Sequence, residues 1–363
     1  MASKETLPHL DIFYRTDLWE EPTRLRPYRK QLVPLAPNVV RSRTTKQIMA
    51  WLASYHQAHT WQLMEALDVS TFTLSRHLRP MYMAGLLSRG RYNPYGSGAI
   101  PYIYQINDSP QTTKWLRDLS YVDWLGVTGG TKISFASNYI RHNMLVGDMV
   151  LAASRLLSPV NVVLGERYAA ASRLVPGSNS AALGDAVLVT ESGLRVVVEL
   201  VANMVDSLPR KVQRWGRLLA TREANELGLV VVFLNAAPPV RQKSMARHLR
   251  QMITSGITPQ TLGGQDGTWY SDREVDRARS GLVIANWPDW FSPGGKPTFA
   301  FGQLFGQRSM DGSTLEPVSI LNFPFQPNDP SKWRDPIKNV PYLYSCPQVL
   351  RDRLGVSMAD AAV

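Results

Sequence analysis

Apolar residues recur at helical spacing in three short stretches of the first third of the chain. A residue that can cap a helix precedes each stretch: Thr44 or Thr45, then Thr60, then Ser70. The apolar positions on the three predicted helices are Ile48, Trp51, Leu52 and Tyr55, then Leu63, Met64 and Leu67, then Leu74, Leu78 and Met81. Residues 86–107 then predict two strands around a Gly- and Pro-rich tip. Three helices followed by a hairpin predict a winged helix-turn-helix over residues 44–107.

The middle of the chain changes to nearly unbroken apolar runs separated by helical patterns. A helix over 137–157, capped by Ser137 or Asn138, opens this region. The predicted strands are 160–165, 185–190, 194–201 and 228–235, with a tight turn at 191–193. A helix beginning near Ser207 lies between the last two strands, and a basic helix follows over 240–256. The order predicts an αβββαβ domain over residues 137–256.

Three further segments lack a clear periodic pattern. Residues 1–43 form a basic arm in which prolines discourage helix, and residues 108–136 predict a linker with a short helical piece near 115–119. Residues 257–363 are rich in proline and tryptophan and predict an irregular C-terminal extension. The sequence thus predicts an α+β multidomain protein.

Composition narrows the function classes. The 363 residues hold 40 Lys and Arg against 29 Asp and Glu, a formal net charge of +11, which favours a polyanionic partner, nucleic acid before membrane. The single cysteine, Cys346, excludes an intrachain disulfide framework and cysteine-rich zinc sites. No apolar stretch has the length of a signal peptide core or a membrane span. A cytoplasmic protein with no membrane partner is the expected class.

The third predicted helix has a polar face suited to the DNA major groove. At about 100° per residue, Arg76 and Arg79 project away from the apolar positions, and Thr73 and Ser75 flank them. Arginine pairs bidentately with guanine, and hydroxyls contact phosphates. Pro80 removes the hydrogen bond to the Arg76 carbonyl, so the helix is expected to kink or end earlier. A winged helix that contacts protein, with solvated arginines, is the alternative.

Two more groups of arginines are candidates for phosphate contacts. Arg89 and Arg91 lie at the predicted wing. Arg210, Arg214 and Arg217 follow an i, i+4, i+7 spacing on the helix after the third strand. A solvated helix face is the alternative interpretation of this second group.

Acidic residues at the predicted strands suggest a metal-dependent nuclease core. Asp185 opens one strand and Glu199 lies near the end of the next, so a hairpin could bring them together, and Glu166 follows the first strand. These three are the candidate Mg²⁺ ligands. Val201 stands where a lysine is expected, and Lys211 on the following helix could replace it. The pattern favours a degenerate scaffold over an active Mg²⁺-dependent endodeoxyribonuclease with Asp185, Glu199 and Lys211 as catalytic residues.

Five local motifs together resemble the replication-relaxation family of bacterial mobile elements. They are LSRHLRPMYMAGLLSRGR (74–91), IRHNMLVGDMVLAA (140–153), LGDAVLV (183–189), VVVELV (196–201) and LPRKVQRW (208–215). The resemblance implies a winged helix joined to a PD-(D/E)xK nuclease-like domain, with Asp185, Glu199 and Lys211 at the family's acidic and lysine positions. Two positions depart from the family pattern: Gly184 replaces a proline, and Val201 replaces a second acid.

The resemblance implies a bacterial DNA-binding accessory protein for replication or mobilisation of a plasmid or other element. Double-stranded DNA is the expected partner, and replication or transfer proteins of the same element and a second copy of the chain are further candidates. A transcription regulator with a C-terminal dimerisation or sensing domain, an active metal-dependent nickase and a structural or assembly protein of a mobile element remain alternatives.

Overall fold

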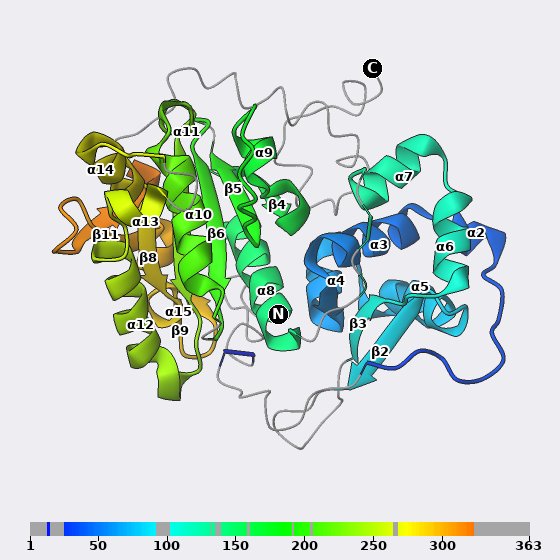
Figure 1. Cartoon of the computed structure of the whole chain (residues 1–363). Coiled ribbons are helices and arrows are strands. Elements are labelled where there is room, and N and C mark those ends of the chain that lie inside the picture. Colours follow the sequence, from blue (N-terminus) through cyan, green and yellow to red (C-terminus); the bar gives the residue numbers. More distant parts are fainter. Residues whose placement is uncertain are drawn as a thin grey trace. The chain divides into compact units, whose positions relative to one another are not determined.

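The computed structural model describes residues 13–14, 25–91, 102–130, 132–133, 135, 139–157, 160–190, 192–203, 206–263 and 268–322. The fold is mixed α+β, with a three-stranded antiparallel sheet and a seven-stranded mixed sheet (Figure 1). Its contacts divide the described residues into two compact units. The N-terminal unit holds residues 25–155, and the sheet unit holds residues 13–14 and 156–322.

The N-terminal unit contains the three helices expected from the sequence: α3 (Arg43–Tyr55), α4 (Thr60–Leu67) and α5 (Thr71–Met83). Most of their apolar positions are buried, as the periodicity predicts, and Ser70 caps α5 by accepting a hydrogen bond from the Thr73 amide. The other two helices begin earlier than predicted, so their capping residues precede the predicted ones in the sequence. Ser42 caps α3 and His59 caps α4, since their side chains reach the free amides of the first turn.

Pro80 lies inside α5 without ending it, and the helix continues to Met83. The expectation of an earlier end is therefore wrong. Proline removes only one backbone donor, and the burial of Leu78 and Met81 on both sides of it holds the helix in place. The Ala84 amide still donates to the Pro80 carbonyl at 2.8 Å.

The predicted hairpin is β2 (Leu87–Arg91) paired antiparallel with β3 (Tyr102–Ile106), and its tip at 92–101 lies outside the described residues. A third strand, β1 (Gln57–His59), pairs with the other edge of β3. The sequence did not predict β1, because three residues are too few to show an alternating pattern.

The segment expected to be a linker is mostly helical. It forms α6 (Pro110–Arg117) and α7 (Tyr121–Thr128), and α7 packs against α3, with the Lys46 ammonium 2.7 Å from the Asp123 carboxylate. The last helix, α8 (Ile140–Leu156), was predicted. Its Asp148 carboxylate accepts a 2.7 Å hydrogen bond from the Gln62 amide of α4. The described residues between 110 and 155, which follow the hairpin, thus belong to the N-terminal unit.

The described part of the arm is also packed. Arg26 forms an isolated antiparallel bridge with Arg89 on β2, and the Val33 amide donates to the Met83 carbonyl. A short helix, α2 (Pro37–Val40), precedes α3 and begins at a proline, which is well tolerated in a first helical turn. Residues 25–42 are therefore attached to the N-terminal unit at two points, although most of them are exposed.

The sheet unit is built on seven strands in the order β12-β11-β8-β7-β6-β5-β4. The predicted strands are β4 (Val160–Gly165), β5 (Ala186–Thr190), β6 (Arg195–Val201) and β7 (Leu229–Asn235). A short 3-10 turn, η1 (Glu166–Tyr168), and the helix α9 (Ala171–Leu174) lie between β4 and β5. Strands β4, β5 and β6 pair antiparallel, whereas β6, β7 and the unpredicted β8 (Leu282–Asn286) are parallel.

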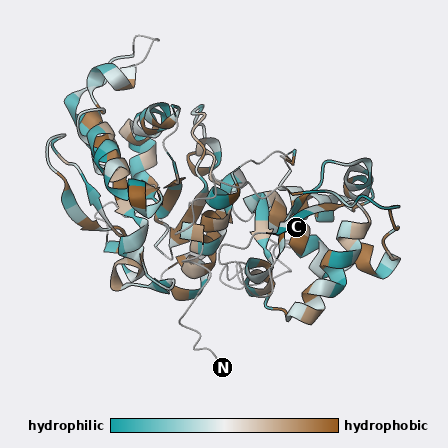
Figure 2. Ribbon diagram, turned by 90° about the horizontal axis from the view of Figure 1, so that it is seen from below, coloured by the Kyte–Doolittle hydropathy of each residue, from teal (hydrophilic) through white to brown (hydrophobic). Residues whose placement is uncertain are grey.

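Helices of the parallel crossovers cover one face of the large sheet (Figure 1). They are α10 (Leu208–Ala220), α11 (Arg222–Glu226), α12 (Pro239–Thr254), α13 (Pro259–Gly263) and α14 (Asp272–Ser280). The helices of both units carry hydrophobic as well as hydrophilic residues, as amphipathic packing requires (Figure 2).

The expectation of an irregular extension is wrong for residues 257–322. This part supplies β8, and β11 (Phe305–Arg308) and β12 (Glu316–Ser319) extend the sheet beyond it. Small elements complete it: α15 (Trp287–Trp290), β9 (Phe291–Ser292), β10 (Lys296–Pro297), α16 (Phe299–Gly302) and η3 (Ile320–Asn322). Trp287 and Trp290 are buried in this core. Residues 323–363 lie outside the described part.

Candidate functional site

Two carboxylates face each other across the β5–β6 hairpin. The register pairs Ala186 with Val198, and the Asp185 amide donates to the Val198 carbonyl at 2.9 Å. One step further along this register places Asp185 opposite Glu199, on the same face of the sheet. The hairpin therefore brings together the two acidic residues that the sequence singled out.

The residue before Asp185 permits this close pairing. A Cβ atom at Gly184 would lie 2.3 Å from the Val197 side chain, which is far inside van der Waals contact. A larger residue would force the start of β5 away from β6. Glycine at this position is therefore a steric requirement of this sheet.

Helix α10 supplies partners for Glu199. The Lys211 ammonium donates to Glu199 Oε2 at 2.7 Å, and the Trp215 indole donates to Oε1 at 2.7 Å. Lys211 and Trp215 are four residues apart, so they lie on the same face of the helix. Asp185 Oδ2 accepts from the Leu200 amide at 2.7 Å. Lys211 is thus where the sequence predicted a substitute lysine, whereas Trp215 was recognised only as an apolar core position.

Burial sets the protonation behaviour of this cluster. Glu199 is 2% exposed. Desolvation, together with the charge of Asp185, raises its pKa to about 7, although Lys211 and Trp215 oppose the rise. Desolvation lowers the pKa of Lys211, but the charges of Glu199 and Asp185 outweigh it, so that pKa lies above its ordinary value. The cluster can hold or exchange one proton near neutral pH.

The carboxylates of this cluster already accept hydrogen bonds from other groups of the protein. Among the described residues, no group of three or more Asp, Glu, His or Cys side chains is placed to hold a metal ion, although the charge of Glu166 acts on Lys211. Both oxygens of Glu199 already accept hydrogen bonds from Lys211 and Trp215. Mg²⁺ prefers free carboxylate oxygens and retained waters. The arrangement is suited to electrostatic positioning of a lysine beside an acidic pair.

The polar face of α5 is open to solvent. Ser75, Arg76 and Arg79 are exposed, Thr73 is half-buried, and Phe72 is 74% exposed. The Arg76 guanidinium lies 5.9 Å from the centroid of the Phe72 ring. Leu74 and Leu78 on the opposite face are buried. The helix therefore presents the residues predicted to contact DNA on one continuous surface.

The arginines of the hairpin are held by tyrosines. The Arg89 guanidinium lies 4.0 Å from the ring centroid of Tyr82 and 4.3 Å from that of Tyr102. Arg91 is exposed and donates to the Tyr102 hydroxyl at 2.6 Å. Tyr82 was not among the predicted site residues. Its position near the end of α5, one turn after Arg79, was the available signal.

The three arginines predicted to line one side of α10 do not share one environment. Arg210 and Arg214 are exposed. The Arg217 guanidinium donates to the Leu262 carbonyl at 2.7 Å and joins α10 to α13. Arg210 and Arg214 thus remain candidates for phosphate contacts, and Arg217 has a structural partner.

The described ranges contain no helix with the length and apolar character needed to cross a bilayer. Comparisons of the chain with protein families, curated proteins and solved structures find no match. Function must therefore be inferred from the geometry of the residues.

Proposed function

We propose that this chain is a DNA-binding accessory protein for replication or mobilisation of a bacterial plasmid or other mobile element. The observation that carries the proposal is the exposed polar face of α5 next to the arginines of the β2–β3 hairpin. Three helices followed by a hairpin are the arrangement expected of a winged helix-turn-helix, in which the third helix enters the major groove.

The individual side chains support duplex DNA as the partner. Arg76 and Arg79 can donate to guanine edges, while Thr73 and Ser75 can contact flanking phosphates. The tyrosines around Arg89 restrict its guanidinium, so less side-chain entropy is lost when it binds a phosphate or enters the minor groove. No acidic side chain on α5 would repel the phosphates, since this helix carries no Asp or Glu.

The sheet unit resembles a PD-(D/E)xK nuclease core that serves as a scaffold or phosphate clamp. Asp185 and Glu199 occupy adjacent strands, and Lys211 neutralises the pair instead of leaving it open to a cation. Arg210 and Arg214 are exposed on the same helix and can bind phosphates. A metal-dependent nickase is the second candidate, favoured by the convergence of Asp185, Glu199 and Lys211 in one cluster.

The DNA site separates this role from that of a transcription regulator. Selection of bound fragments from the DNA of the host and its mobile elements, with the full chain, is expected to enrich a site at a replication or transfer origin. Enrichment only at the chain's own promoter would support the regulator instead. Absence of any DNA binding at low salt would overturn both and favour a protein-binding winged helix.

A further inference from the structure

Helix α12 carries a surface of one charge sign. Its buried stripe consists of Met245, Leu249 and Ile253. The sequence of α12, PVRQKSMARHLRQMIT, contains no Asp or Glu. Because α12 has no acidic residue, every charged side chain on its polar face is basic.

Three side chains on this face form what we name the α12 basic face: Lys243, Arg247 and Arg250. They follow an i, i+4, i+7 spacing, so they lie on one side of the helix. Lys243, Arg247 and Arg250 are exposed, and within the described residues none of these three side chains has an ion-pair or hydrogen-bond partner. Their positive charges are therefore not neutralised by the protein.

Helix α14 in the same unit shows the opposite arrangement. Its sequence, DREVDRARS, alternates acids and bases, and Arg279 lies 3.5 Å from Asp276. This is the pattern of a solvated helix that satisfies its own charges. The neighbouring helix α10 also lacks acidic residues, so it adds no carboxylate beside α12. The α12 basic face thus differs from an ordinary solvated surface.

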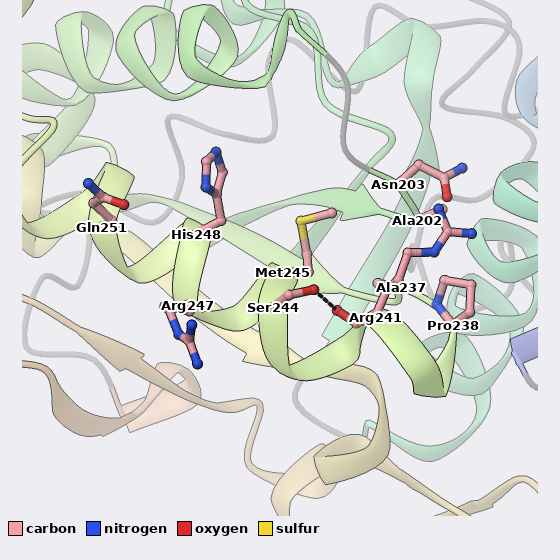
Figure 3. Close-up of a pocket in the computed structure, with 10 residues that line it drawn as sticks. All are labelled: Ala202, Asn203, Ala237, Pro238, Arg241, Ser244, Met245, Arg247, His248 and Gln251. Carbon is pink, nitrogen blue, oxygen red and sulfur yellow. Dashed lines mark hydrogen bonds between the residues drawn. The ribbon is translucent and has the colours of Figure 1, made fainter.

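A cavity of about 300 Å³ borders this face (Figure 3). It lies where β6 and β7 end, with Ala202, Ala237 and Met245 among its lining residues. Arg241 and His248 also line it, and in Figure 3 the Arg241 side chain extends toward Asn203. Ligands of open α/β sheets commonly bind outside the carboxyl ends of parallel strands. Neither Asp185 nor Glu199 lines the cavity.

We propose that the α12 basic face binds the phosphodiester backbone of DNA. This contact is additional to the one assigned to α5 and rests on the proposed function of the chain as a DNA-binding protein. Unneutralised arginines and lysines attract phosphates without reading sequence, because counterions released from DNA supply the free energy. The sheet unit thereby adds affinity, and α5 supplies sequence preference.

The test measures binding of the full chain to a synthetic duplex over a range of salt concentrations. Arg247→Glu with Arg250→Glu is expected to make the slope of log affinity against log salt shallower by about 2, since the variant neutralises two fewer phosphates. The matched control, Arg273→Glu with Lys296→Glu, makes the same charge change at exposed positions of the same unit and is expected to retain most of the wild-type slope. Arg247→Lys with Arg250→Lys keeps the charge and is also expected to retain it.

Three results would overturn the proposal in distinguishable ways. If the α12 and control reversals change the slope equally, net charge alone acts and the α12 basic face is no site. If the α12 reversal leaves the slope unchanged while an α5 variant loses binding, the proposed function stands and the second contact fails. If the wild-type chain binds no DNA at low salt, both fail together. Thermal melting of each variant checks that the fold is retained.

Discussion

Lys211 opposes the effect of burial on the pKa of Glu199. Burial and Asp185 raise the pKa of Glu199 to about 7, and Lys211 limits that rise. The folded pKa of Glu199 exceeds its unfolded value, so its contribution to stability is present at low pH and is lost as pH rises toward 7. Removing Lys211 would raise the folded pKa further and extend this loss to higher pH.

We therefore expect Lys211→Ala to destabilise the protein more at pH 8 than at pH 5, by about 1–3 kcal/mol at the higher pH because the lysine is partly exposed. Urea unfolding at the two pH values measures the difference. Lys243→Ala removes an exposed lysine from another helix and is expected to change stability little at either pH. Equal destabilisation by Lys211→Ala at both pH values would mean that packing, not charge, is responsible.

Asp148 in α8 makes a separate pH-dependent contribution to the free energy of unfolding. Desolvation raises its pKa to about 8, and its hydrogen bond from Gln62 opposes the rise. Because the folded pKa lies above the unfolded value, the free energy of unfolding falls as pH rises from about 4 to about 8. Asp148→Asn keeps the shape without the ionisation, so the variant is expected to be more stable than the wild type at pH 8. Parallel stability curves for the two proteins across this range would contradict the assignment.

At the scale of elements, α5 combines a buried and a functional face. Arg76→Ala with Arg79→Ala removes side chains that are exposed, so thermal stability is expected to change little. DNA affinity is expected to fall by about 1–3 kcal/mol for each base-specific hydrogen-bonded pair that the substitutions remove. Gel-shift titrations at matched salt measure the effect, with Arg117→Ala and Lys132→Ala, exposed in the same unit, as the control pair. Unchanged binding by the α5 variant would show that another element reads the DNA.

The elements themselves differ in how far the sequence predicts them. Helices α3, α4 and α5 follow from apolar residues at helical spacing, and β4 to β7 follow from runs rich in valine. The sequence did not identify Ser42 and His59 as the caps, because several hydroxyl and polar residues lie near the start of each helix. The carboxylate pair was predictable from the hairpin turn, which fixes the register of β5 against β6.

At the scale of the whole molecule, the main question is catalysis. We expect no robust nuclease activity from the chain alone, because Lys211 and Trp215 already bind both oxygens of Glu199. The assay compares the wild type with Asp185→Ala and Glu199→Ala on supercoiled and single-stranded DNA, with Mg²⁺ and with Mn²⁺. Nicking by the wild type that both variants lose would assign the protein to the nucleases. Nicking that all three share would indicate a contaminating enzyme.

Local pattern alone determined α3, α4, α5 and α8, the hairpin of the N-terminal unit and the central strands, because helical periodicity and apolar runs act over a few residues. Only the tertiary structure decided the rest. Strands β1, β8, β11 and β12 are short, and β1 and β8 pair with strands distant in the sequence. The pairing of α10 with Glu199 through Trp215, and of Arg217 with Leu262, likewise depends on how helices pack. Such contacts are stabilised by burial against distant segments, which no local window of the sequence contains.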